Sequence, residues 1–199
     1  MEVSGAVLAG GRGTRLGQDK ALVEVGGESL LARVVGRLAQ VCAEVLVVGR
    51  VTGPPLPAPA RFVPDLIPGQ AALGGLYTAL SAAACPLVIV VACDMPFVEP
   101  TLLRFLLGLF GDGVDAVVPL VGQEPQPLHA VYSRTCAAAA ATQVATGDLK
   151  VARLLQRLRV RYVAEAQLRV VDPELRSFFN INTPADLELA RSLVGGWAH

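Results

Sequence analysis

A glycine-rich loop with three cations begins near the start of the chain and has the composition of a polyphosphate site. The apolar run 3–9 leads into residues 10–20, which contain Gly10, Gly11, Gly13 and Gly17 together with Arg12, Arg15 and Lys20. Glycine lets a backbone approach a ligand closely, and successive N–H groups in such a turn form a concave anion site. Arg15 and Lys20 add full positive charges. We therefore expect the loop to bind a nucleotide.

The spacing of the glycines separates this loop from two common phosphate-binding motifs. A dinucleotide fingerprint that uses Gly11 and Gly13 needs its third glycine one position before Gly17. A P-loop needs a Gly-Lys-Ser/Thr sequence, which residues 10–20 do not contain. The structural alternative is an ordinary turn between a strand and a helix, with arginines on the surface. Three cations within nine residues favour the binding site.

Asp94 is the strongest candidate for a metal ligand. It follows the apolar run Leu87–Ala92 and precedes Pro96, which interrupts regular structure. A carboxylate at the end of a strand can hold Mg²⁺, which takes oxygen ligands and keeps phosphates attached. The alternative is a turn or helix-cap aspartate. Considered together with the cationic loop, Asp94 is better interpreted as a metal ligand.

Four further polar residues leave two interpretations open. Asp65 follows Pro64, where it would contact a ribose or base or simply begin a turn; the residues alone favour the turn. Asn180 and Asn182 alternate with Ile181, so an extended segment would place both amides on one face. They would donate to phosphate, help to ligate a metal, or form turns. His129 is either a phosphate donor or a core residue.

Together these groups suit nucleotidyl transfer. Attack on an α-phosphorus spreads charge over the triphosphate, and positioning with charge stabilisation supplies most of the rate. Arg15 and Lys20 would neutralise the phosphates, and Mg²⁺ on Asp94 would bridge the α-phosphate and an incoming acceptor phosphate. A phosphate acceptor is already ionised, so the reaction requires no general base. Arg15, Lys20 and Asp94 are thus the expected catalytic residues.

Alternating strands and helices must position these residues. Strands are expected at 3–9, 45–48, 61–63, 87–92, 116–119 and 129–132, with a loop at 51–60. Helices are expected at 30–41 after the Ser29 cap, 74–84, 99–110, 136–144, 149–158 after an Asp148 cap, and from Thr183-Pro184 onward. The pattern predicts one three-layer α/β domain over residues 1–199 with a mostly parallel sheet. Ligands bind beyond the carboxyl ends of such strands, so residues 10–20 and Asp94 should share one edge.

Composition narrows the class of protein further. Of 199 residues, 53% are hydrophobic and 17% charged, which suits a densely buried α/β body. The formal net charge is zero, which argues against a nucleic-acid surface. The four cysteines lie far apart without a C-x-x-C pair, as in a reduced cytoplasmic protein. No apolar run has the length of a membrane span, so we expect no membrane partner.

Five motifs resemble the molybdenum cofactor guanylyltransferases, in order and over nearly the whole chain. They are Leu8-Ala9-Gly10-Gly11, Arg15-Leu16-Gly17-Gln18-Asp19-Lys20, Cys93-Asp94-Met95-Pro96-Phe97, Pro127-Leu128-His129-Ala130-Val131-Tyr132 and Asn180-Ile181-Asn182-Thr183-Pro184. The resemblance implies a Rossmann-like nucleotidyltransferase fold. It also implies transfer of GMP from GTP to molybdopterin, with release of pyrophosphate and formation of molybdopterin guanine dinucleotide.

The resemblance assigns roles to individual residues and suggests partners. It implies nucleotide contacts at Leu8, Ala9 and Gly10, phosphate binding at Lys20, a GTP contact at Asp65 and Mg²⁺ at Asp94. Gly75 matches a glycine at which the backbone meets the nucleotide, and Asn180 and Asn182 line the cofactor side. Gly11 and Gly13 complete the nucleotide loop. The implied partners are GTP, molybdopterin or the molybdenum cofactor, and the proteins that insert the cofactor or receive it.

Two departures leave the identity of the base open. Residues 71–75 lack the first glycine and the proline that often precede this helix in the family, and Val48-Gly49-Arg50 lacks a polar residue usual after the second strand. Both lie where base and ribose would sit. The alternatives are a cytidylyltransferase for the same cofactor, a sugar-phosphate nucleotidyltransferase, and a non-catalytic nucleotide or cofactor carrier. Residues 11–16 also resemble the loop of the sugar-phosphate enzymes.

Overall fold

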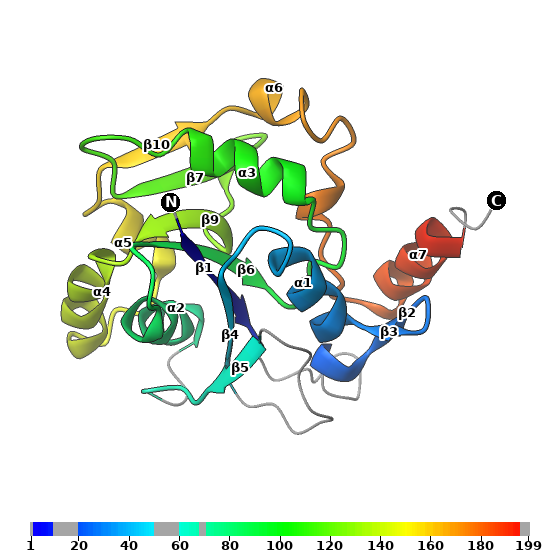
Figure 1. The fold of residues 1–199 in the computed structure, drawn as a ribbon, viewed down its shortest axis with the longest axis horizontal. Helices are drawn as coiled ribbons and strands as arrows, with labels where there is room; N and C mark the ends of the chain where they lie inside the picture. Colours follow the sequence, from blue (N-terminus) through cyan, green and yellow to red (C-terminus); the bar gives the residue numbers. More distant parts are fainter. Residues whose placement is uncertain (1, 10–19, 50–59, 68–70, 196–199) are drawn as a thin grey trace.

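The computed structural model describes residues 2–9, 20–49, 60–67 and 71–195, and its centre is an eight-stranded sheet (Figure 1). The strand order is β10-β7-β9-β6-β1-β4-β5, with β8 paired to β7. The strands are β1 (Val3–Leu8), β4 (Glu44–Val48), β5 (Ala60–Val63), β6 (Leu87–Ala92), β7 (Ala116–Val121), β8 (Glu124–Pro125), β9 (His129–Ser133) and β10 (Val160–Val163). A separate hairpin pairs β2 (Glu24–Val25) with β3 (Glu28–Ser29).

Most neighbouring strands run parallel, as the alternating pattern predicts. β1 is parallel to both β4 and β6, β4 is parallel to β5, and β7 is parallel to β10. β9 is antiparallel to its neighbours β6 and β7. The expected α/β class with a mostly parallel sheet is therefore confirmed, and the segment expected to be extended at 129–132 is the antiparallel strand.

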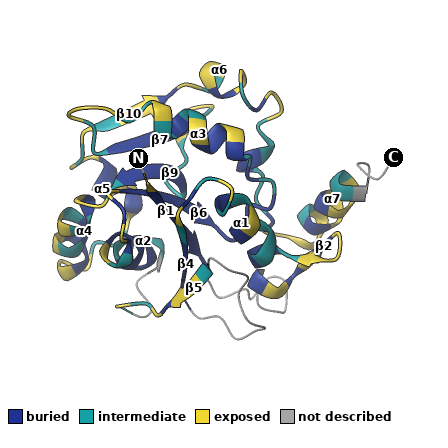
Figure 2. Cartoon of the chain, viewed as in Figure 1, coloured by how far each residue is buried: buried dark blue, intermediate teal, exposed yellow. Residues whose placement is uncertain are grey.

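Helices cover both faces of the sheet. They are α1 (Leu30–Leu38), α2 (Ala71–Ala82), α3 (Pro100–Gly108), α4 (Cys136–Ala145), α5 (Val151–Leu155), α6 (Glu165–Leu168) and α7 (Pro184–Gly195), with two 3-10 turns, η1 (Lys20–Leu22) and η2 (Arg176–Phe178). In β1, Val7 belongs to the core shared with α1 and α3, whereas Leu8 belongs to the core shared with α2, α4 and α5. Successive strand residues point to opposite faces, which gives three layers with the buried strands in the middle (Figure 2).

Several helix boundaries differ from the sequence prediction. Ser29 does cap α1, because its hydroxyl accepts a 3.2 Å hydrogen bond from the Ala32 N–H. By contrast, α2 begins three residues earlier than expected, at Ala71. The predicted helix 149–158 is shortened to α5, whose cap residue is Lys150. Asp148 instead accepts a 3.2 Å bond from the Lys150 N–H, so it forms a turn before the helix and is not its cap.

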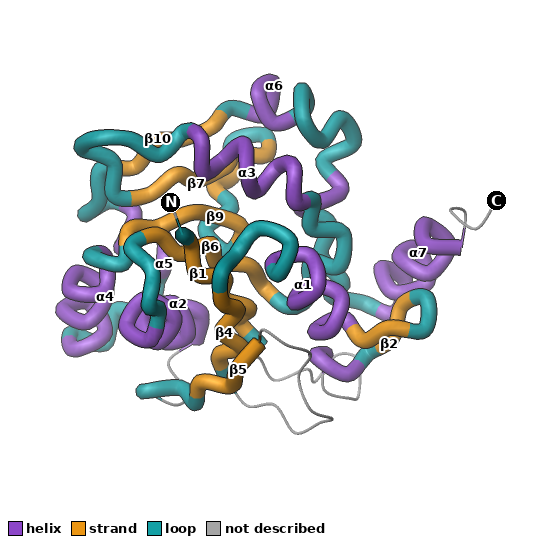
Figure 3. Tube along the Cα trace, viewed as in Figure 1, coloured by secondary structure: helices purple, strands orange, loops and turns teal. Residues whose placement is uncertain are grey.

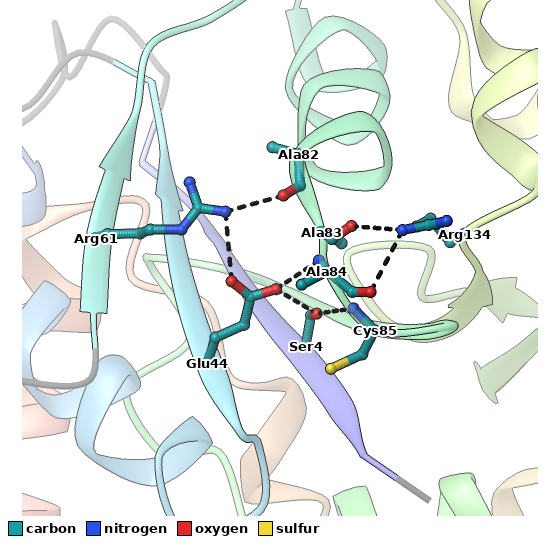
Figure 4. A network of polar contacts seen from close by, with 8 residues as sticks. All are labelled: Ser4, Glu44, Arg61, Ala82, Ala83, Ala84, Cys85 and Arg134. Carbon is teal, nitrogen blue, oxygen red and sulfur yellow. Dashed lines mark hydrogen bonds and ion pairs between the residues drawn. The ribbon is translucent and has the colours of Figure 1, made fainter.

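A polar network fixes the end of α2 to the amino edge of the sheet (Figure 4). One carboxylate oxygen of Glu44 accepts hydrogen bonds from the Ser4 hydroxyl (2.6 Å) and the Ala84 N–H (2.7 Å). The Arg61 guanidinium donates to the other carboxylate oxygen (3.3 Å) and to the Ala82 carbonyl (2.9 Å). Arg134 donates to the carbonyls that follow, so the otherwise unpaired C-terminal carbonyls of α2 find donors.

The last helix lies away from the three layers. Figure 3 shows α7 beside the β2–β3 hairpin, beyond α1 and at a distance from the remaining helices. Both elements contribute to a small hydrophobic core that is separate from the two sheet cores. Within the described ranges, no helix is both long and apolar enough to cross a membrane.

Candidate functional site

The register of the parallel strands aligns their carboxyl ends along one edge. Leu8 lies opposite both Val48 and Ala92, and Val48 lies opposite Val63. Cross-strand hydrogen bonds continue one residue further: the Ala9 N–H donates to the Val48 carbonyl (2.8 Å), and the Cys93 N–H donates to the Leu8 carbonyl (3.1 Å). The end of β1, which leads into the glycine-rich loop, therefore lies beside the turn that carries Asp94.

Part of the predicted phosphate loop lies outside the described residues. Gly10, Gly11, Gly13 and Arg15 fall there, so their roles stay predictions. The structure resumes at Lys20, the first residue of η1. Ala21 is fully buried in the core that contains α1, and the Leu30 N–H donates to the Val23 carbonyl (2.8 Å). Lys20 thus begins a segment that is attached to the body on its C-terminal side.

Asp94 stands half-buried immediately after β6. Its carbonyl accepts a 2.9 Å hydrogen bond from the Ile181 N–H. In the described part of the chain no three His, Cys, Asp or Glu side chains gather as a metal cage. Mg²⁺ commonly needs only one or two protein carboxylates, with phosphates and water completing its oxygen shell. A single carboxylate at a sheet edge, beside the strand end that leads into the predicted phosphate loop, fits that pattern.

The two asparagines are brought next to Asp94, although they lie far from it in sequence. Ile181 is fully buried, and its N–H forms the bond to Asp94. Asn180 and Asn182, on either side of it, are half-buried and exposed. The Asn180 amide donates to the Phe178 carbonyl (3.0 Å), and the backbone N–H of Asn182 donates to the Asp186 carboxylate (2.9 Å).

Asp65 follows β5 on the same edge, two strands away from β1. It is half-buried, and burial raises the pKa of its carboxyl above the usual value. The turn around it is held by Thr78 of α2, whose hydroxyl accepts a 3.1 Å bond from the Leu66 N–H. Among the described residues, none donates a hydrogen bond to the Asp65 carboxylate.

Two glycines face this edge, and one of them was missed by the sequence prediction. Gly75 lies in α2, where a Cβ would come within 3.5 Å of Leu8 Cδ1, an ordinary contact. Gly49, the residue after β4, has a φ of +124°, a conformation that other residues rarely adopt. Its N–H donates to the Val63 carbonyl (3.2 Å). The sequence signal that could have identified Gly49 is a glycine directly after a buried strand.

His129 is a buried core residue. Its imidazole is fully buried and tilted against the ring of Phe178, with centroids 4.8 Å apart. Neither ring nitrogen has a hydrogen-bond partner among the residues that the structure describes. Burial lowers its pKa to about 4, although the Asp172 carboxylate opposes the shift. Of the two interpretations that the sequence left open, the structure favours the core residue over the phosphate donor.

Comparisons with known proteins agree with this geometry. The model of the MobA-like NTP transferase domain matches residues 5–163. The chain is 44% identical to a probable molybdenum cofactor guanylyltransferase of Pelotomaculum thermopropionicum, over 98% of this chain and 94% of that protein. It is 33% identical to the molybdenum cofactor guanylyltransferase of Desulfosudis oleivorans, over 96% of both. The chain belongs to the molybdenum cofactor guanylyltransferase family.

Solved structures place this guanylyltransferase-family chain in the same fold. Molybdopterin-guanine dinucleotide biosynthesis protein A from Archaeoglobus fulgidus superposes with a TM-score of 0.84 at 32% identity, covering 97% of this chain and 99% of that one. The 2-C-methyl-D-erythritol 4-phosphate cytidylyltransferase of Thermus thermophilus gives 0.73 at 26% identity, covering 98% and 100%. The resemblance and the nucleotidyltransferase fold predicted from sequence are confirmed, and the chain is a nucleotidyltransferase enzyme.

Proposed function

We propose that the enzyme transfers GMP from GTP to the phosphate of molybdopterin, releasing pyrophosphate and forming molybdopterin guanine dinucleotide. One observation carries the proposal: the end of β1 and the turn of Asp94 share an edge, joined by the 3.1 Å bond from Cys93 to Leu8. A triphosphate held by the loop after β1 would then lie next to the Asp94 carboxylate. The names of the relatives supply the nucleotide and its acceptor.

The donor side is formed by the loop and the neighbouring strand ends. Leu8 and Ala9 bring the backbone to the nucleotide, and Gly10, Gly11 and Gly13 direct N–H groups to its phosphates. Arg15 and Lys20 neutralise their charge. Asp65 and Gly75 lie on the nucleoside side, where a free carboxylate accepts hydrogen bonds from a ribose or a base.

The reaction is a displacement at the α-phosphorus of GTP. An ionised phosphate oxygen of the acceptor forms a bond to that phosphorus, and the bond to the β-phosphate oxygen breaks. The electron pair leaves with pyrophosphate, and no proton is transferred. Asp94 is the proposed ligand for Mg²⁺, which when bound neutralises charge shared by the α-phosphate and the acceptor phosphate. The chain itself supplies positioning and positive charge.

Asn180 and Asn182 form the acceptor side. Their segment is held against the Asp94 turn through Ile181, which supports a place near the incoming phosphate. Amide groups donate hydrogen bonds to phosphate without adding charge, so they orient the acceptor. Proteins that supply molybdopterin or receive the finished cofactor are further expected partners.

Pyrophosphate release with each of the four nucleoside triphosphates, in the presence of Mg²⁺ and molybdopterin, tests the proposal. We expect release with GTP, at a rate well above those with CTP, ATP and UTP, and no release without acceptor. A preference for CTP would overturn the guanylyl assignment and favour the cytidylyltransferase. Tight GTP binding without release would favour the non-catalytic carrier.

A further inference from the structure

A small core separate from the two sheet cores joins several parts of the proposed site. We call it the α7 core. Its buried members are Val23, Val25, Leu30, Ile181, Leu187 and Ala190, and Phe97, Phe179 and Val194 pack against it. These residues come from the segment after Lys20, the turn after Asp94, the asparagine segment and α7. The first three parts contain or adjoin Lys20, Asp94 and the two asparagines, whereas α7 carries no residue with a role in the proposed reaction.

The first turn of α7 holds the backbone of Asn182 directly. One carboxylate oxygen of Asp186 accepts hydrogen bonds from the Asn182 N–H (2.9 Å) and the Thr183 N–H (2.8 Å). In return, the Thr183 hydroxyl accepts a 3.2 Å bond from the Asp186 N–H. Such a reciprocal arrangement fixes the direction in which the chain enters a helix. Here the entering chain is the asparagine segment.

The hydrophobic contacts of the α7 core hold the same segment from the other side. Ile181 is fully buried among them, while its N–H donates to the Asp94 carbonyl (2.9 Å). The Phe97 ring, three residues after Asp94, lies against Phe179 with centroids 5.7 Å apart. The Asp94 turn and the asparagine segment therefore meet through a hydrogen bond and a ring contact, and Leu187 is buried in the same core.

The far end of α7 packs against the hairpin that follows Lys20. Gly26, in the turn between β2 and β3, has a φ of +62°, and a Cβ there would lie only 2.5 Å from the Val194 side chain. Val23 and Val25 of the same segment are buried in the α7 core. One helix thus packs against segments from both the donor and the acceptor side of the proposed site.

We propose that α7 is a positioning element for the acceptor, acting through Asp186 and Leu187. Asp186 fixes the backbone of Asn182, and Leu187 keeps Ile181 seated against the Asp94 turn. In this proposal neither side chain contacts the substrate, and both act through the asparagine segment. The inference rests on the proposed function, because it states what holds the acceptor side of that site in place.

Steady-state kinetics with Asp186→Ala and Leu187→Ala test this role. A misplacement of about 1 Å in a positioning group can reduce a rate by up to about 100-fold. We expect kcat/KM for molybdopterin to fall about 10- to 100-fold, while KM for GTP stays within about twofold. Asp186→Asn should restore most of the activity, because its amide oxygen can accept the same two bonds. Leu187→Met should do likewise, because it conserves side-chain volume.

Leu154→Ala is the matched control. Leu154 is fully buried and Leu187 is only 8% exposed, but Leu154 lies in α5, in the core on the α2 and α4 side of the sheet. Its truncation should lower the thermal midpoint about as much as Leu187→Ala does and leave both KM values unchanged. Equal kinetic losses in Leu154→Ala and Leu187→Ala, or unchanged acceptor kinetics in the α7 variants, would overturn the inference.

Amide hydrogen exchange provides a readout that does not depend on activity. In the absence of substrate, Asp186→Ala should accelerate exchange at Ile181, Asn182 and Thr183 and leave the amides of β6 protected. Unchanged exchange at these three amides would also overturn the inference. A wild-type enzyme that fails to release pyrophosphate would instead contradict the proposed function, and the exchange result would still decide whether α7 holds the segment.

Discussion

Asp94 follows the end of β6, and its side chain and backbone have separate roles. The carboxylate belongs to the proposed metal site, and the carbonyl binds the asparagine segment. Its carboxylate is half-buried at the sheet edge, while its carbonyl is occupied by the Ile181 N–H at 2.9 Å. The backbone of Asp94 thus has a structural function that does not depend on its side chain. A substitution that changes only the carboxylate should therefore separate chemistry from folding.

Asp94→Asn is expected to abolish most activity without lowering stability. The amide keeps the size of the side chain but removes the charge that the proposed Mg²⁺ needs, so pyrophosphate release should fall at least about 100-fold. The thermal midpoint should stay within about 2 °C of the wild type. Asp112→Asn, at an exposed turn, is the matched control and should keep full activity. Normal turnover by Asp94→Asn would move the metal site elsewhere.

His129 makes the stability of the protein depend on pH. Burial lowers the pKa of its imidazole to about 4, from an ordinary value of 6.5. Between these values the unfolded chain takes up a proton that the folded chain does not bind. The free energy of unfolding therefore falls as the pH decreases from 6.5 toward 4, by about 2 kcal/mol between pH 7 and pH 5. Well above pH 6.5 the imidazole is neutral in both states, and the group then contributes no pH dependence.

His129→Phe should remove that pH dependence. Phenylalanine keeps a ring against Phe178 and eliminates two buried nitrogens that lack partners. We expect stability at pH 7 to be equal or up to about 1 kcal/mol higher, because an unsatisfied buried polar group is costly. Urea unfolding at pH 7 and pH 5 measures both effects. An equally steep decline in the variant would show that another group titrates in this range.

At the scale of elements, β1 and α1 are in close contact at Gly5. A Cβ at this position would lie 3.0 Å from Cys42 Sγ and 3.3 Å from two atoms of Leu38. The strand can approach the helix only because the side chain is absent. Gly36, on the exposed face of α1, has the opposite environment, since no described atom lies within 4 Å of its would-be Cβ.

Gly5→Ala and Gly36→Ala should therefore change stability in opposite directions. Overpacking at residue 5 is expected to cost about 1 to 3 kcal/mol, whereas alanine at residue 36 should add up to about 1 kcal/mol through helix propensity. Chemical unfolding of both variants at one pH measures the difference. Combining Gly5→Ala with Cys42→Ala should recover part of the loss; no recovery would mean that Leu38 alone restricts the space.

Most of the strands and helices that the sequence predicted have a long apolar pattern. Leu87–Ala92 is buried at every position and was predicted at its observed boundaries. The β2–β3 hairpin was missed because each strand has two residues, too few for any periodicity to show. The strand β10 was also missed; Arg161 and Tyr162 are exposed at the sheet edge, as Arg61 and Phe62 are in β5, which was predicted from its place before Pro64-Asp65. Short elements depend on tertiary contacts that no local pattern encodes.

In the candidate site, too, some features follow from the sequence pattern and others depend on tertiary contacts. The general rule about strand ends predicted that the loop after β1 and Asp94 would share an edge, because it depends only on parallel order. Asn180 and Asn182 are brought to Asp94 by the bond from the Ile181 N–H, and Ile181 shares its core with Leu187 and the hairpin. These contacts join residues distant in sequence, and nothing in the asparagine motif itself specifies them. Gly49 was missed because its positive φ is a property of the folded chain.

At the scale of the whole molecule, the carboxyl and amino ends of the strands form two edges of the sheet with different functions. The carboxyl edge carries the candidate site, whereas the amino edge holds the network of Ser4, Glu44 and Arg61 (Figure 4). The helix α2 connects the two edges. Its Gly75 lies against Leu8 beside the site, and its last carbonyls are fixed at the opposite edge by Arg61 and Arg134. Glu44 is the centre of this attachment.

The stabilisation that Glu44 contributes depends on pH, because folding shifts the pKa of its carboxyl. Burial alone would raise that pKa, but hydrogen bonds from Ser4 and Ala84 together with the Arg61 guanidinium lower it below its ordinary value of 4.5. The stabilisation that results is fully present above pH 4.5. It is lost as the pH falls through the lowered pKa of the folded state. The unfolded chain binds a proton at Glu44 more readily than the folded chain does, so acid favours the unfolded chain.

Glu44→Gln should therefore destabilise the protein at neutral pH and much less in acid. The amide keeps one oxygen acceptor but loses the charge that strengthens these bonds, so we expect a loss of about 1 to 2 kcal/mol at pH 7. The difference between wild type and variant should shrink below pH 4.5, and the contribution of His129 cancels because both proteins retain it. Urea unfolding from pH 7 to pH 3 measures this difference. A constant difference across that range would mean that the network stabilises through shape and neutral hydrogen bonds, with no contribution from the Glu44 charge.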